Sequence, residues 1–301
     1  ITALTEVLEQ MRPDVVLVQG DTTTAMVGAL AAFYQKIPVG HIEAGLRTYN
    51  RYSPFPEEIN RHLIGVLATY HFAPTQTAAK ALQAENVPAE NIFVTGNTVI
   101  DALLWITQQP PSKRTRRLLT RLGIQPGNPG RLRTILVTAH RRENFGRPFE
   151  NICVALRELV HRNPDVQLVY PVHLNPNVQE PVHRILKENE RVHLIEPLPY
   201  ETFAHLMNHA YFIITDSGGI QEEAPALGKP VLVLREVTER PEAVEAGAVK
   251  IVGTNPDRII AEAEKLLYDE AEYRRMARAI SPYGDGHAAE RIVRVLLERL
   301  A

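Results

Sequence analysis

Short apolar runs alternate along this chain with longer segments in which apolar residues recur at helical spacing. The short runs are typical of buried strands, and the longer segments indicate helices that pack against a sheet. This alternation predicts right-handed βαβ units around a parallel sheet. In the first part of the chain the predicted strands are Asp14–Gln19, Pro38–Glu43, Tyr70–Pro74 and Ile92–Thr95, and the predicted helices are Ile1–Arg12, Thr24–Gln35, Glu57–Leu67, Gln76–Glu85 and Thr98–Thr107.

A stretch rich in turn-forming residues then interrupts the pattern. It contains Gln108-Gln-Pro-Pro-Ser-Lys, a short basic helix and Gln125-Pro-Gly-Asn-Pro-Gly-Arg, which carry little that could build a core. The alternation restarts after it, so we expect an α/β protein of two Rossmann-like parallel-sheet domains that face a cleft. The expected domains are residues 1–110 and 111–283, with a final helix at about 284–301 that packs back onto the first domain. Strands of the second domain are predicted at Thr134–Thr138, Val166–Tyr170, Val192–Glu196, Phe212–Thr215, Val231–Leu234 and Val249–Val252.

The composition is ordinary for a globular protein, with 45% hydrophobic and 23% charged residues among 301. The formal net charge of −2 gives no general attraction to nucleic acid or to an anionic membrane, so we expect neither as a partner. The sequence shows no signal peptide and no apolar run near the roughly 18 residues that span a bilayer, which predicts a cytoplasmic protein. The single cysteine, Cys153, is expected in the core. Nothing in the sequence predicts a metal or a cofactor.

Three acids stand where segments of the first domain end or begin. Asp21 follows the first predicted strand, Glu43 ends the second, and Glu57 lies in Pro54-Phe-Pro-Glu-Glu-Ile-Asn-Arg. Because the carboxyl ends of neighbouring parallel strands open into one crevice, we expect these carboxylates to converge on a ligand. Carboxylates with different environments can serve as acid and base in one site, so this crevice is where proton transfer is expected.

A small-residue turn follows a predicted strand in the second domain, at Asp216-Ser-Gly-Gly. Ser217, Gly218 and Gly219 allow close approach of the backbone, and the helix that follows points its free N–H groups at the turn, which favours phosphate binding. The alternative is a tight strand-to-helix connection in which the glycines serve packing only. Glu223, one turn into the helix, favours a nucleotide because an acid there could accept ribose hydroxyl groups.

A cationic segment, Thr138-Ala-His-Arg-Arg-Glu-Asn-Phe-Gly, follows another strand of the same domain. A run of charges is more often a solvated surface, but this one lies at the carboxyl end of a strand, where ligands bind in open α/β sheets. We therefore expect it to face phosphate, with His140 as the candidate contact. The alternative for His140 is a residue that only terminates the strand.

Together these motifs resemble those of the non-hydrolysing UDP-N-acetylglucosamine 2-epimerases, which share the two-domain architecture of the GT-B glycosyltransferases. The resemblance extends over the whole chain. It is carried by Gly20–Thr24, His41–Thr48, Pro54–Arg61, His71–Thr75, Gly96–Asp101, Thr138–Asn144, Asp216–Pro225, Thr238–Glu242 and Tyr283–Ala288.

The resemblance implies interconversion of UDP-GlcNAc and UDP-ManNAc in a pathway to surface polysaccharide. Removal of a C2 proton with no adjacent carbonyl is difficult, and the family is understood to eliminate UDP, form 2-acetamidoglucal, and add UDP back with the proton on the other face. Asp21, Glu43 and Glu57 match the family's catalytic carboxylates, and His140 matches the residue that contacts the diphosphate. The resemblance also implies a homodimer.

The UDP contacts implied by the resemblance all lie in the second domain. They are the phosphate contacts Ser217, Gly218 and Gly219, the ribose contact Glu223, the cation Arg240 and the uracil-side residue Phe203. Arginine suits bidentate contact with a diphosphate. A lone aromatic residue in an amphipathic helix is otherwise typical of a core, so Phe203 has that alternative.

One departure from the family pattern concerns the start of the chain. Family members have a first strand followed by Gly-Thr-Arg-Pro-Glu, and this motif is absent here. We therefore expect residues before Ile1 in the natural protein, an incomplete first sheet, and an unpaired apolar edge near Val15–Val18. Two alternatives to an active epimerase follow: a catalytically impaired fragment that binds a UDP-sugar, and a GT-B glycosyltransferase. The three acids of the first domain favour the epimerase.

Overall fold

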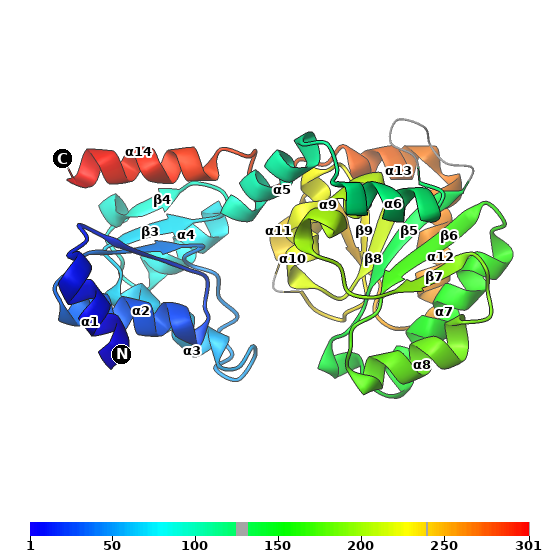
Figure 1. Ribbon diagram of the computed structural model, residues 1–301, viewed down its shortest axis with the longest axis horizontal. Coiled ribbons are helices and arrows are strands. Elements are labelled where there is room, and N and C mark those ends of the chain that lie inside the picture. Colours follow the sequence, from blue (N-terminus) through cyan, green and yellow to red (C-terminus); the bar gives the residue numbers. More distant parts are fainter. Residues whose placement is uncertain (125–131, 239, 301) are drawn as a thin grey trace. The chain divides into compact units, whose positions relative to one another are not determined.

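The computed structural model describes residues 1–124, 132–238 and 240–300. The chain divides into two compact units, the first formed by Ile1–Ala102 with Pro282–Ala301 and the second by Leu103–Ser281 (Figure 1). Both units are α/β with all-parallel sheets, which confirms the predicted fold class. The first unit is therefore discontinuous in sequence.

The first unit contains a four-stranded sheet in the order β1-β2-β3-β4. Each strand pairs in parallel with the next strand in sequence, the arrangement that short connections between successive elements favour. Its strands are β1 Val16–Gln19, β2 Val39–Ile42, β3 Tyr70–Ala73 and β4 Ile92–Val94. Its helices are α1 Thr2–Met11, α2 Thr23–Tyr34, α3 Glu57–Leu67, α4 Gln76–Ala84, the short η1 Ala89–Asn91, the start of α5 Thr98–Gln108, and α14 Ala288–Leu300.

Small side chains let α2 lie close to the sheet of the first unit. Ala29 and Ala32 are fully buried against Val18 and Val39. Helix α14 completes a separate cluster, in which Ile292 and Leu296 pack with Phe72 of β3. Strand β1 is an edge of this sheet in the described part of the chain, and its Leu17 is 45% exposed.

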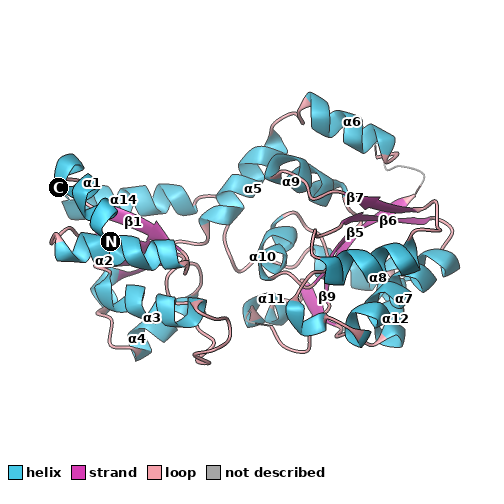
Figure 2. Ribbon diagram, turned by 60° about the horizontal axis from the view of Figure 1, so that its bottom comes forward, coloured by secondary structure: helices cyan, strands magenta, loops and turns pink. Residues whose placement is uncertain are grey.

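The second unit has a six-stranded sheet in the order β10-β9-β8-β5-β6-β7. Helices α7, α8 and α12 lie on one face, and α6 and α9 lie on the other (Figure 2). The strands are β5 Arg133–Thr138, β6 Val166–Pro171, β7 Val192–Ile195, β8 Phe212–Thr215, β9 Val231–Val233 and β10 Val249–Ile251. The helices are the end of α5, α6 Lys113–Arg121, η2 Arg142–Asn144, α7 Arg147–Arg162, α8 Pro176–Leu186, α9 Tyr200–His209, α10 Gly218–Ala226, α11 Pro241–Glu245, α12 Pro256–Tyr268 and α13 Glu270–Ala277.

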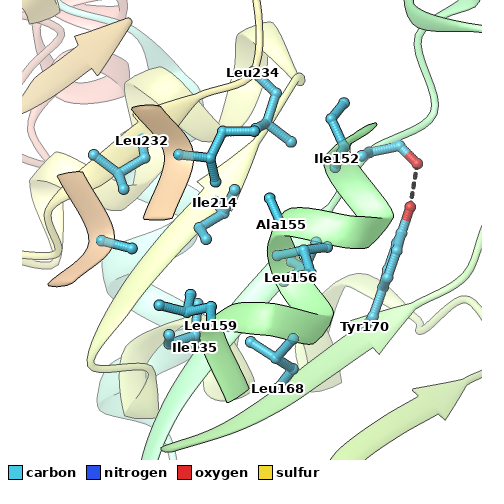
Figure 3. Packing of buried hydrophobic residues seen from close by; sticks show 14 of the residues in the cluster. Ile135, Ile152, Ala155, Leu156, Leu159, Leu168, Tyr170, Ile214, Leu232 and Leu234 are labelled. Atoms are coloured by element: carbon cyan, nitrogen blue, oxygen red, sulfur yellow. Dashed lines mark hydrogen bonds between the residues drawn. The ribbon is translucent and has the colours of Figure 1, made fainter. Parts of the chain in front are cut away.

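The main core of the second unit lies between the sheet and α7 with α12. Leu156 and Leu159 of α7 pack against Ile135 and Ile214 from the central strands (Figure 3). The hydroxyl of Tyr170 in the same layer donates a hydrogen bond to the carbonyl of Ala139, 2.6 Å away, so its one polar atom is satisfied. The fully packed centre holds the strand ends that carry the candidate site in fixed positions.

Several predictions about particular segments can be compared with the structure. Cys153 is fully buried, as predicted, and burial raises the pKa of its thiol to about 12. The basic segment after residue 112 is helix α6. The units divide within α5, whereas the predicted boundary at residue 110 follows that helix. The turn-forming segment 125–131 lies outside the described residues.

Candidate functional site

Asp21 lies directly beyond the carboxyl end of β1. Its carboxylate oxygen Oδ2 is 2.8 Å from Nη2 and 2.9 Å from Nε of Arg61, which is one turn into α3. The side-chain amide of Asn60 donates to the backbone carbonyl of Asp21 at 2.9 Å. Two neighbouring residues of α3 therefore hold both the side chain and the backbone of Asp21, while its side chain stays 28% exposed.

Glu43 lies beyond the end of the adjacent strand, β2, and is brought close to the residue before Asp21. The Gly20 N–H donates to the Ile42 carbonyl at 3.0 Å, which continues the β1–β2 pairing past the strand end. A Cβ placed on Gly20 would be 3.5 Å from Oε2 of Glu43. Glu43 has a φ of +65°, a left-handed conformation that costs energy for a residue other than glycine. With this backbone conformation, the Glu43 carboxylate lies beside Gly20.

His41 of β2 contacts the backbone at Gly20. Its ring nitrogen Nε2 is 2.8 Å from the carbonyl of Gly20, and only 1% of the residue is exposed. Burial lowers the pKa of His41 to about 4, although the hydrogen bond to Gly20 raises it. The ring is therefore neutral at pH 7, and its Nε2–H donates to the carbonyl. His41 therefore fixes the backbone of Gly20, which precedes Asp21 and lies beside Glu43.

Glu57, the third predicted acid, is the first residue of α3. Its side chain is partly exposed at the positive end of the helix dipole, where a carboxylate is stabilised. The same helix carries Asn60 and Arg61, which contact Asp21. The structure thus places Asp21 and Glu43 just beyond the ends of two paired strands, and it places Glu57 on the helix whose Asn60 and Arg61 contact Asp21.

The neighbouring acid, Glu58, has a different environment. It is 1% exposed, and its carboxylate accepts hydrogen bonds from the backbone N–H groups of Thr48 and Tyr49 at 3.1 and 2.8 Å. It also pairs with Nη1 of Arg61 at 2.8 Å. Burial alone would raise the pKa of Glu58, but the two backbone donors and the Arg61 cation bring this pKa below its ordinary value. Glu58 is therefore an ionised anchor that joins the loop after β2 to α3 and positions Arg61.

In the second unit, the buried carboxylate of Asp216 organises the cationic segment after β5. Its Oδ2 accepts from the backbone N–H groups of His140 and Arg141, both at 2.8 Å, and from the amide of Asn144 at 3.3 Å. Its Oδ1 is 3.7 Å from Nδ1 of His140. Asp216 is fully buried at the end of β8, the strand next to β5. This acid was not among the residues singled out from the sequence.

His140 lines a cavity of about 220 Å³ in the second unit. Its ring stacks on that of His173, with ring centres 5.3 Å apart. Burial lowers the pKa of His140; Asp216 raises it, whereas His173 and Arg141 lower it further. The cavity also contains Phe203 and Ser217, so the structure brings three predicted site residues together. The lining residues are Thr138, His140, Pro171, His173, Pro197, Leu198, Phe203, Ser217 and Ile220.

The amino end of α10 opens beside this cavity. Ser217 is the N-cap residue, its side chain makes no capping hydrogen bond, and Gly218 and Gly219 form the first turn. The first N–H groups of a helix have no partner within the helix, so this turn offers donors and a positive dipole end. An anion that entered the cavity at Ser217 would meet them.

Two acids of α10 are already engaged. Glu223 is 8% exposed, and its Oε2 accepts a hydrogen bond from the hydroxyl of Tyr200 at 2.6 Å. Burial raises the pKa of Glu223, and Glu222 raises it further, while Tyr200 opposes them. Glu222 in turn pairs with Nε of Arg240. The predicted residues Glu223 and Arg240 are thus each held by a partner that the sequence pattern did not reveal, Tyr200 for Glu223 and Glu222 for Arg240.

The residues that sequence reasoning missed are mostly the supports of the predicted ones. Arg61, Glu58 and Asp216 are charged and buried, a combination that proteins rarely tolerate without partners. Within the described ranges, no group of three or more histidine, cysteine or acidic side chains could hold a metal ion. In the same residues, no helix is both long and apolar enough to cross a membrane.

Comparison with known proteins gives a consistent result. A family model described as UDP-N-acetylglucosamine 2-epimerase matches residues 1–297. The chain is 58% identical over 297 residues to the UDP-N-acetylglucosamine 2-epimerase of Salmonella typhimurium, covering 98% of this chain and 78% of the relative. It is 57% identical over 296 residues to the protein of the same name from Escherichia coli strain K12, with the same coverage.

Solved structures of UDP-GlcNAc 2-epimerases have a similar fold. The structure is similar to UDP-GlcNAc 2-epimerase from Neisseria meningitidis bound to UDP-GlcNAc, with a TM-score of 0.89 and 50% identity, covering 99% of this chain and 80% of that one. It is also similar to UDP-GlcNAc 2-epimerase from Methanocaldococcus jannaschii, with a TM-score of 0.83, 37% identity and the same coverage.

Proposed function

Because the chain belongs to the UDP-N-acetylglucosamine 2-epimerase family, we propose that it inverts C2 of UDP-GlcNAc to give UDP-ManNAc by eliminating UDP and adding it back. It is an isomerase, and the glycosyltransferase alternative is therefore set aside. Elimination solves the problem posed by a C2 proton that has no adjacent carbonyl. It requires an acid or base near C2 on each face of the sugar and a group that stabilises the departing UDP.

The acids of the first unit are proposed to act on the sugar. A carboxylate removes the C2 proton as the C1–O bond to UDP breaks, which leaves 2-acetamidoglucal and UDP. Positive charge that develops at C1 is stabilised by a second, fixed carboxylate. Re-addition of UDP to C1, with a proton delivered to the opposite face of C2, completes the inversion. Asp21, Glu43 and Glu57 share these roles.

The residues of the second unit are proposed to hold UDP. Ser217 and the backbone of Gly218 and Gly219 bind phosphate at the start of α10, where N–H donors and the helix dipole favour an anion. His140, in the same cavity, contacts the diphosphate and stabilises it as a leaving group. The remaining proposed contacts are Phe203 on the uracil side, Glu223 at the ribose and Arg240 at the nucleotide's charge.

The observation that carries the mechanism is the placement of Asp21 and Glu43 at the ends of two paired strands. Asp21 is held at fixed geometry by Arg61 and Asn60, and Glu43 is held by a strained backbone, which is the preorganisation that proton transfer requires. Asp21→Asn and Glu43→Gln should each lower kcat by about 10²-fold or more, because positioned acid–base catalysis contributes about 10²–10⁴.

The experiment incubates the 301-residue chain with UDP-GlcNAc in deuterium oxide and follows UDP-ManNAc and deuterium at C2 by NMR. Asp14→Asn is the matched control, because this exposed acid lies near the opposite end of β1. UDP affinity should stay unchanged in both site variants, since its contacts are in the second unit. Turnover at the unaltered rate in Asp21→Asn and Glu43→Gln would refute the roles of these acids. UDP binding without any turnover in the unaltered chain would support the impaired-fragment alternative instead.

Two further expectations from the sequence stay predictions. One is a cytoplasmic location, which a free and buried Cys153 suits because cytosolic proteins rarely use disulfides. The other is a homodimer, which the family resemblance implies. Analytical ultracentrifugation of the 301-residue chain would test the second.

A further inference from the structure

A second, larger cavity lies in the second unit and borders the cavity of His140, Phe203 and Ser217. It is a groove of about 1060 Å³ between helix α6 and strand β7, closed at one end by the start of α9. The residues that line it are Lys113, Arg114, Arg117, Leu118, Arg121, Leu122, Val192, His193, Leu194, Ile195, Glu196, Pro197, Leu198 and Thr202. None of these residues is among those proposed to bind UDP or to act on the sugar. Pro197 and Leu198 line both cavities.

The helical wall of this groove is strongly cationic. Helix α6 has the sequence Lys-Arg-Thr-Arg-Arg-Leu-Leu-Thr-Arg and contains no acid. Four of its cations line the groove at helical spacing, so they form one stripe. Arg121 and His193 both line the groove. Burial lowers the pKa of His193, and the charge of Arg121 lowers it further. Glu196 is the one acid among the lining residues.

The cationic helix is fixed in place over the sheet. The hydroxyl of Ser112 caps its first turn at the Thr115 N–H. Glu201 of α9 accepts hydrogen bonds from the Ser112 N–H and the Thr115 hydroxyl, at 3.0 and 2.6 Å. At the other end, the amide of Gln167 donates to the Leu122 carbonyl at 3.1 Å. The groove is thus bounded by a preformed wall.

The opposite wall is a sheet edge with unused backbone groups. In the described residues β7 pairs only with β6. Leu168 and Val172 of that neighbouring segment donate to the carbonyls of Arg191 and Ile195. Because backbone groups alternate in direction along a strand, the N–H and C=O of Leu194 point away from β6. They point toward the open side of the sheet, where the groove lies.

We propose that this groove binds an acidic peptide segment in an extended conformation, which adds a strand beside β7 and places its carboxylates against Arg117 and Arg121. Three features of the groove fit this occupant together. The Leu194 backbone supplies the hydrogen bonds of strand addition, Leu118 and Leu122 with the β7 side chains supply apolar pockets, and the α6 stripe supplies complementary charge. A polyphosphate or a nucleic acid would use the charge alone and would leave the backbone edge unused.

The test uses the 301-residue chain and a fluorescein-labelled peptide of alternating glutamate and valine, seven residues long, in fluorescence polarisation at low salt. Arg117→Glu combined with Arg121→Glu should weaken binding about tenfold or more, because charged hydrogen bonds are lost and repulsion replaces them. Arg116→Glu, an exposed cation of the same helix outside the groove, is the matched control and should change affinity little.

Two further measurements test strand addition. Leu194→Pro removes the outward N–H and is compatible with an edge strand, so affinity should fall about three- to tenfold. A peptide of the same sequence with N-methyl groups on alternate amides tests the same hydrogen bonds without altering the protein, and it should bind far more weakly. Far-ultraviolet circular dichroism and UDP affinity check the fold of each variant.

Several results would overturn the proposal. Absence of binding at millimolar peptide would do so, as would equal affinity for the N-methylated peptide. Inorganic polyphosphate or single-stranded RNA that bound more tightly than the peptide, with Leu194→Pro unaffected, would identify the groove as an anion site and exclude strand addition. Equal loss from Arg116→Glu would show attraction to the helix as a whole and no specific groove.

Discussion

Glu57 and Glu58 are adjacent acids with opposite expected functions, and replacing each by glutamine separates them. Glu58→Gln removes the charge that accepts the Thr48 and Tyr49 N–H groups and that pairs with Arg61. Glu57→Gln removes a partly exposed carboxylate at the start of the same helix. We expect the first change to lower stability and the second to lower turnover while stability is kept.

The magnitude for Glu58→Gln follows from its contacts. Breaking a buried ion pair from one side costs about 3–5 kcal/mol. Arg61 retains its pairing with Asp21, and glutamine can still accept one of the two backbone N–H groups, so we place the loss of unfolding free energy at about 2–3 kcal/mol. For a unit of this size, at about 4 °C per kcal/mol, the first unit should melt roughly 10 °C lower.

Thermal unfolding by calorimetry measures this loss, because the two units can melt separately and only the first should shift. Hydrogen exchange gives a local readout: the Thr48 and Tyr49 amides, which donate to Glu58, should exchange faster in Glu58→Gln. The effect has a defined pH dependence. Since the folded-state pKa of Glu58 is lowered, its stabilisation is full above the unfolded-state pKa and is lost as the pH falls through the folded-state pKa.

The difference between the unaltered protein and Glu58→Gln should therefore shrink in acid. Glu57→Gln, made in the same helix with the same chemical change, should melt within about 0.5 kcal/mol of the unaltered protein, as surface substitutions usually do. Its kcat should fall about 10²-fold or more. A melting point kept in Glu58→Gln, or full activity in Glu57→Gln, would refute the assignment of an anchor and a catalytic acid.

For two more variants, the structure determines the direction of the expected effect. Burial lowers the pKa of His41 and His71 to about 4, so the stability that each neutral ring contributes is full above the unfolded-state pKa of 6.5, and up to about 3 kcal/mol per histidine is lost as the pH falls from 6.5 to 4. The unfolding free energy, measured by denaturant titration at several pH values, should therefore depend less steeply on pH in His71→Asn than in the unaltered protein. Equal pH dependence of the two proteins would contradict the prediction. Asp216→Asn should weaken UDP binding, measured by calorimetric titration, by about tenfold or more, because the N–H groups of His140 and Arg141 lose a buried charged acceptor; an unchanged affinity would show that their segment holds its shape without Asp216.

The strands could be predicted because most are buried on both faces and read as continuous apolar runs. Ile135, Leu136 and Val137 of β5, all fully buried, are an example. Helix α13 did not stand out in the same way. It buries Met276 alone, so tertiary packing defines it more than its pattern does.

The positions of candidate site residues could be predicted where they follow strands, as for Asp21, Glu43 and Ser217. The sequence could not predict which of the adjacent acids Glu57 and Glu58 is buried. Successive helix residues differ by about 100° in direction, and the contact of Glu58 with the loop at Thr48 decides which of the two is buried. The Tyr200–Glu223 contact joins residues on different helices. Local patterns carry no information on such a pair.

The discontinuous first unit affects how this protein is made on the ribosome. Phe72 belongs to an early strand, but Ile292 and Leu296, which cover it, belong to α14 and are synthesised only after the entire second unit. The second unit can therefore complete its core during translation, whereas the first must wait with an exposed apolar surface. That interval is when a chaperone or an aggregating neighbour would meet the nascent chain.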